Sequence, residues 1–90
     1  MKVIINDCYG GFSVSEAVMK EMGWESPYDC SDRTDPKLIE VVERLGKDAN
    51  GGCASLRVVE IPEEATDWRL EEYDGAETVW YVLDGKMYSA

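Results

Sequence analysis

The chain has 90 residues, of which 44% are hydrophobic, and 19 acidic against nine basic residues give it a net charge of −10. This length predicts a single domain over residues 1–90, and the hydrophobic content is too high for a disordered chain. The excess of carboxylates disfavours direct nucleic-acid binding, which needs clustered lysine and arginine. The apolar runs are too short for a membrane span and no leader pattern is recognisable, so we expect a cytoplasmic protein without membrane contact.

The first predicted elements are an apolar strand over residues 2–8, a loop that contains Gly10 and Gly11, and a helix. We call this loop the glycine loop. Ser13 and Glu16 have the spacing of a capping box, which predicts the helix start, and Gly23 is expected to end the helix. A loop between a strand and a helix N-terminus directs backbone N–H groups and the helix dipole to one place. This segment is therefore the first candidate for an anion site.

A second helix is predicted to begin at Asp35-Pro36, because aspartate caps helices and proline suits the first helical position. Its apolar residues recur at i, i+3, i+4 and i+7 and form one face: Leu38, Val41, Val42 and Leu45. The helix is expected to end at Gly46 or to continue one turn to Asn50-Gly51-Gly52.

Three further strands are predicted over residues 56–61, 68–73 and 78–83, and two Asp-Gly pairs indicate tight turns. The second of these turns, at Asp84-Gly85, leaves room for a short fifth strand. The order β-α-α-β-β-β predicts an α+β fold with two helices packed on one face of a mainly antiparallel sheet. The first strand is expected inside that sheet because it is short and almost entirely apolar.

The predicted ligand site combines the glycine loop with Arg33, whose guanidinium can hold a phosphate or carboxylate through two hydrogen bonds. The expected ligand is a small, nucleotide-type anion, bound by Asn6, Tyr9, Gly10, Gly11, Phe12, Ser13, Arg33 and Lys37. Structural alternatives remain open. A Gly-Gly pair also suits a sharp turn, and Arg33 can instead pair with Asp32, Asp35 or an acidic residue on a strand.

Residues 60–77 contain eight acidic residues opposed only by Arg69. Such a run is either a solvated surface or a mimic of a phosphate backbone that binds a basic protein. For the second alternative, the expected partner-binding residues are Glu60, Glu63, Glu64, Glu71, Glu72, Asp74 and Glu77.

The chain offers little catalytic chemistry, since it contains no histidine. Its cysteines, Cys8, Cys30 and Cys53, are widely spaced and form no Cys-x-x-Cys motif. We therefore predict reduced thiols, no metal, no cofactor and no catalytic residue, so the protein is not expected to be an enzyme. Cys8 lies beside the glycine loop but has no base to activate it, so it is expected to be a small, buried hydrophobic residue.

Two segments, Cys8-Tyr9-Gly10-Gly11-Phe12 and Arg33-Thr34-Asp35-Pro36, together with residues 59–62 and 71–75, resemble a family of small proteins encoded by tailed bacteriophages and prophages. The resemblance extends from the first strand to about Glu77 and implies a phage accessory protein in the host bacterial cytoplasm. Such proteins often counter host defences. Three hypotheses follow: sequestration of a nucleotide-type signal, inhibition of a host nuclease or other effector by the acidic segment, and a structural or assembly role. A homodimer is expected.

Overall fold

A computed structural model describes residues 1–90. Its elements, in chain order, are β1 (Lys2–Asn6), α1 (Glu16–Met22), α2 (Pro36–Leu45), the short 3₁₀ helix η1 (Gly46–Ala49), β2 (Leu56–Glu60), β3 (Asp67–Tyr73), β4 (Ala76–Leu83) and β5 (Lys86–Ser89). The predicted α+β class and element order are confirmed, including the fifth strand. Neither helix combines the length and apolar character that crossing a membrane would require.

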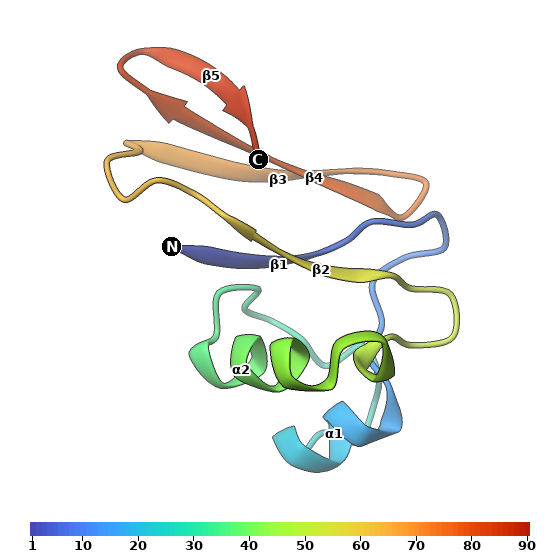
Figure 1. Cartoon of the computed structure of the whole chain (residues 1–90). Coiled ribbons are helices and arrows are strands. Elements are labelled where there is room, and N and C mark those ends of the chain that lie inside the picture. Colours follow the sequence, from blue (N-terminus) through green and yellow to red (C-terminus); the bar gives the residue numbers. More distant parts are fainter.

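The strands form two antiparallel sheets, β1–β2 and β3–β4–β5. Figure 1 shows three layers, with the helices on one side of the β1–β2 sheet and the three-stranded sheet on the other. The expectation that the first strand lies inside a sheet is wrong, because β1 pairs with β2 alone. Its apolar sequence has another cause: β1 is covered by layers on both faces.

Two hydrophobic clusters hold these layers together, and β1 contributes to both because successive strand side chains point to opposite faces. Ile4 packs with the helices, in a cluster with Val18 and Leu38. Val3 and Ile5 point the other way and pack with Val59, Ile61 and Val79. The β1–β2 sheet is therefore the central layer of the molecule.

The helix boundaries follow local capping chemistry, with one difference from expectation. Ser15, not Ser13, is the N-cap of α1, and its hydroxyl accepts a 3.4 Å hydrogen bond from the Val18 amide. The predicted Ser13–Glu16 capping box is wrong because the chain is still extended at Ser13, and the next residue, Val14, bridges to Asn50. The predicted end of α1 at Gly23 is confirmed.

The second helix has the predicted ends. Asp35 caps α2 by accepting from the Lys37 and Leu38 amides, and Pro36 occupies the first turn. Helix α2 stops before Gly46, and the extra turn anticipated from the sequence takes the tighter 3₁₀ form. Cys8, Cys30 and Cys53 are free thiols, with Cys8 exposed rather than buried as expected.

Candidate functional site

The structure brings Arg33 and the glycine loop to the same region, but the guanidinium of Arg33 already forms an ion pair with a carboxylate of the protein itself. The Nη1 and Nη2 atoms of Arg33 donate to Oε1 and Oε2 of Glu77 at 2.6 and 2.9 Å. The guanidinium also lies over the ring of Phe12, 3.7 Å from its centroid. Only 5% of the Glu77 side chain is exposed. Of the alternatives open for Arg33, pairing with an acidic residue on a strand is the one observed.

This ion pair lies at the edge of β1 that no strand covers. Oε1 of Glu77 accepts the Asn6 amide at 2.7 Å, and the carbonyl oxygen of Arg33 accepts the Ile4 amide at 2.9 Å. Buried backbone N–H groups need such acceptors, and an unpaired strand edge leaves them without any. Arg33 and Glu77 thus supply the hydrogen bonds that a neighbouring strand would otherwise provide.

Asn6 extends the same cluster through its side chain, which is fully buried. Its Nδ2 donates to the carbonyls of Cys8 and Gly75, both at 2.7 Å, and its Oδ1 accepts the Ser55 amide at 2.8 Å. All three hydrogen bonds are made within the chain. The Asn6 side chain therefore links the end of β1 to the β3–β4 turn. Both polar groups of its amide are already hydrogen-bonded within the chain, so neither is left for a ligand.

The glycine loop packs directly against the β3–β4 turn. The Gly10 amide donates to the Asp74 carbonyl at 3.1 Å. A Cβ added to Gly75 would collide with the Gly11 nitrogen, so the two backbones touch. Gly10 and Gly11 have φ values of +119° and +94°, which side chains disfavour. The glycines thus fit a sharp turn and a close approach of two backbones.

The remaining predicted ligand residues lie apart from this cluster. Tyr9 is 67% exposed, and Lys37 is exposed in the first turn of α2 and forms no ion pair. Ser13 faces a different hollow. Asn6, Phe12, Arg33 and the two loop glycines are brought together, but against Glu77 and the β3–β4 turn before it. Glu77 falls on the alternation of β4 that carries the buried Val79, and this pattern was the available indication that its carboxylate points inward.

Most of the acidic segment is exposed, and we call its exposed residues the acidic strip: Glu60, Glu63, Glu64, Asp67, Glu71, Glu72 and Asp74. Of these seven, only Glu71 forms an ion pair, with Arg69 at 2.9 Å. On β3, Glu71 and Glu72 point to opposite faces of the sheet, and Glu72 stands opposite Glu77. The strip follows the β2–β3 connection and β3, which pairs with β4 alone. Glu77, expected among the partner-binding residues, is buried in its pair with Arg33 and does not belong to the strip.

Aromatic side chains lie beside the acidic strip, on the face of the three-stranded sheet that points away from β1–β2. Tyr73 and Trp80 line a shallow hollow of about 270 Å³ there, together with Glu71 and Thr78. Tyr73 is 73% exposed. Exposed aromatic residues bordered by charges are common at the centre of protein interfaces.

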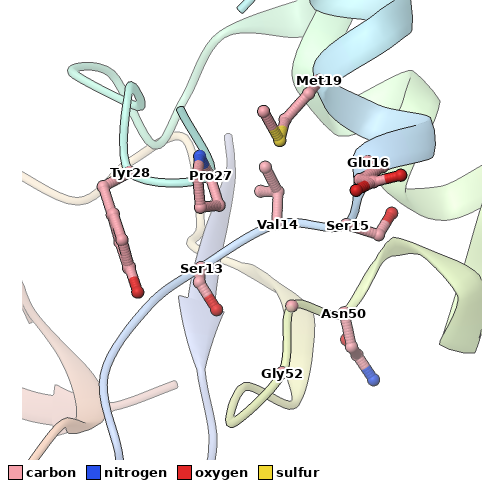
Figure 2. Close-up of a pocket in the computed structure, with 10 residues that line it drawn as sticks. Ser13, Val14, Ser15, Glu16, Met19, Pro27, Tyr28, Asn50 and Gly52 are labelled. Carbon is pink, nitrogen blue, oxygen red and sulfur yellow. The ribbon is translucent and has the colours of Figure 1, made fainter. Parts of the chain in front are cut away.

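A second hollow, of about 340 Å³, lies between the segment before α1, the loop at Pro27 and the turn after η1 (Figure 2). We call it the Ser13 pocket, and its walls include Ser13, Val14, Ser15, Met19, Pro27 and Asn50. Figure 2 shows Tyr28 on one side and Glu16 on the other. Of the eight predicted ligand residues, only Ser13 lines it.

No three or more cysteine, aspartate or glutamate side chains form a cluster that could hold a metal ion. No protein-family model, curated protein or solved structure matches the chain. The resemblance to phage proteins therefore stays a prediction.

Proposed function

We propose that this protein is a non-catalytic binding protein whose acidic strip occupies a basic groove of another protein, where nucleic acid would otherwise bind. One observation carries the proposal. Six exposed carboxylates of the strip form no salt bridge: Glu60, Glu63, Glu64, Asp67, Glu72 and Asp74. Of these, Glu60 lies opposite Lys2 in the β1–β2 sheet, and the other five have no such cross-strand cation.

Electrostatics supports a basic partner. Like charges gathered along one segment repel one another, and a positively charged groove relieves that repulsion while accelerating association. The net charge of −10 adds to the attraction at long range. Tyr73 and Trp80, next to the strip, offer the large, stiff contacts that anchor protein interfaces.

The competing hypothesis, sequestration of an anionic ligand at Arg33, has less support. A ligand phosphate would have to displace the Glu77 carboxylate and leave that group buried without its counterion, at a cost of about 3–5 kcal/mol. The carboxylate would also lie close to the incoming anion. We therefore favour the inhibitor hypothesis over sequestration.

The phage resemblance, taken as a premise, would make the partner a host nuclease or another defence effector in the bacterial cytoplasm. The expected homodimer and assembly role stay predictions that sedimentation can test. The carboxylates on β3 oppose pairing of that edge with a second copy, because they would bring like charges together.

The test is salt-dependent capture of bacterial DNA-binding enzymes, with duplex DNA as competitor. Wild-type protein is compared with a strip variant, Glu63→Lys/Glu64→Lys, and a control, Glu25→Lys/Asp48→Lys, which makes the same charge change at exposed sites outside the strip. We expect the strip variant to bind at least about tenfold more weakly and the control within about threefold, because contacts at the interface exceed long-range effects.

Two further outcomes are diagnostic. Duplex DNA should displace the captured enzyme, and the retained amount should fall steeply as salt rises from about 0.05 to 0.5 M. Equal losses in the two variants, or capture that is insensitive to salt and to DNA, would contradict the proposal.

A further inference from the structure

The Ser13 pocket contains a polar group that the fold does not use. Ser13 is only 6% exposed, and its carbonyl accepts the Gly51 amide at 3.1 Å. Its hydroxyl makes no hydrogen bond to the chain. Every fully buried side-chain oxygen and nitrogen in the protein has a partner, so this oxygen is not among the fully buried ones. The unpaired hydroxyl is therefore open to the hollow that Ser13 lines (Figure 2).

The turn after η1 leaves room for this hydroxyl. A Cβ added to Gly51 would collide with the Oγ and the backbone of Ser13. Asn50, next to it, uses its Oδ1 to accept the Leu56 amide at 2.7 Å, which fixes the wall of the pocket. The floor is thus polar and held in place by the backbone.

The side-chain charge of the pocket disfavours an anion. Glu16 is the only lining residue charged at neutral pH, and no lysine or arginine lines the hollow. The Tyr28 ring on the opposite side can attract a cation through its π face. The net charge of −10 also concentrates cations around the protein.

The remaining walls are apolar. Val14, Met19 and Pro27 form one side of the hollow, beyond the polar floor. The volume of about 340 Å³ lies at the lower end of the range for small-molecule sites. A short hydrocarbon chain fits such a wall.

We propose that the Ser13 pocket binds a small organic cation, namely an alkylammonium group. The ammonium donates to the Ser13 hydroxyl, between the Tyr28 ring and the negative charge of Glu16 on the two sides of the hollow, and the alkyl chain packs on the apolar wall. This site is separate from the acidic strip, so it adds a small-molecule ligand to the proposed protein partner.

The test is calorimetric titration of the full chain with n-pentylamine and 1,5-diaminopentane. 1-Pentanol serves as the neutral analogue and inorganic phosphate as the anion. We expect the amines to bind, phosphate to give no heat, and the alcohol to bind at least about tenfold more weakly, since a charge-assisted hydrogen bond is lost. Amide NMR shifts should locate the amine at Ser13 and Val14.

Two variants and one matched control separate the site from general charge attraction. Ser13→Ala and Glu16→Gln should each weaken amine binding by about tenfold. Glu63→Gln, which removes the same charge from a residue that does not line the pocket, should leave the amine affinity within about twofold. Equal affinity for pentylamine and pentanol, equal losses in Glu16→Gln and Glu63→Gln, or the absence of amine binding would overturn the proposal. The strip variant Glu63→Lys/Glu64→Lys should keep the pocket intact, so the failure of one proposal is distinguishable from the failure of the other.

Discussion

Arg33 holds Glu77 by two hydrogen bonds, of 2.6 and 2.9 Å, and so fixes the β3–β4–β5 sheet against the open edge of β1. The two residues are 44 positions apart in the chain. Oε1 of Glu77 also accepts the Asn6 amide, so one carboxylate serves both the ion pair and the backbone. Removing either partner leaves the other as an uncompensated, largely buried charge.

Substitution of either partner is therefore expected to destabilise the protein strongly. Arg33→Ala and Glu77→Ala should each lower the free energy of unfolding by about 3–5 kcal/mol, the range for breaking a buried ion pair. Arg33→Lys should recover only part of this loss, because an ammonium cannot form the two parallel hydrogen bonds. Urea unfolding followed by circular dichroism measures the effect.

The exposed pair between Lys2 and Glu43, 2.9 Å long, is the matched control. Glu43→Ala should cost no more than about 1 kcal/mol, because solvent screens both partners. Similar losses in the free energy of unfolding for Glu43→Ala and Glu77→Ala would show that the Arg33–Glu77 pair stabilises the fold no more than an exposed pair does.

Two Asp-Gly turns allow the close approach at the glycine loop to be tested separately from backbone strain. Gly75 and Gly85 have φ values of +90° and +77°, but only a Cβ at Gly75 would collide with the Gly11 nitrogen. Gly85→Ala should cost about 1–2 kcal/mol, from the left-handed backbone alone. Gly75→Ala adds a backbone clash and should cost more, as thermal unfolding of both variants would reveal. Equal losses of stability in the two variants would mean that the glycine loop and the β3–β4 turn are not in close contact.

Local chemistry made most of the elements predictable from the sequence. Asp35-Pro36 and Gly23 marked helix ends, and the alternating and apolar runs marked the strands. These features act between neighbours in the chain. The division into two sheets was not predictable, because an apolar strand such as β1 is buried equally well by flanking strands or by layers above and below.

The candidate site was harder to predict because it depends on contacts between distant residues. The sequence placed Arg33 and the glycine loop in one region correctly, but it could not show that the acidic residue meeting Arg33 is Glu77. The role of Ser13 was missed for a similar reason. Its spacing to Glu16 fits a capping box, yet pairing of Val14 with Asn50 keeps the chain extended there.

The turn from Asp32 to Thr34, which contains Arg33, should become less stable at low pH. Hydrogen bonds from the Thr34 hydroxyl and amide, at 2.6 and 2.9 Å, lower the pKa of Asp32. A lowered pKa in the folded state means that the stabilisation is present above the ordinary aspartate value. It is lost as the pH falls through the folded value, below about pH 4.

NMR titration of the Thr34 amide would follow this loss. The resonance should move with a midpoint below that of an aspartate in a short model peptide. Asp32→Asn should remove the transition. A midpoint at or above the peptide value would contradict the assigned hydrogen bonds.

The three thiols should differ in reactivity, because only the thiolate is a good nucleophile. Cys8 and Cys53 are exposed, whereas Cys30 is half-buried. Burial raises the pKa of the Cys30 thiol, although the nearby positive charge of Arg33 partly opposes the shift. At pH 8, iodoacetamide should therefore label Cys8 and Cys53 at least about tenfold faster than Cys30, as peptide mass spectrometry would show.

In urea the labelling rates of the three thiols should converge, since unfolding removes the burial of Cys30. Labelling of Cys30 as fast as the other two in the folded protein would place this thiol in water, and the packing of Cys30 against the helices would then be incorrect.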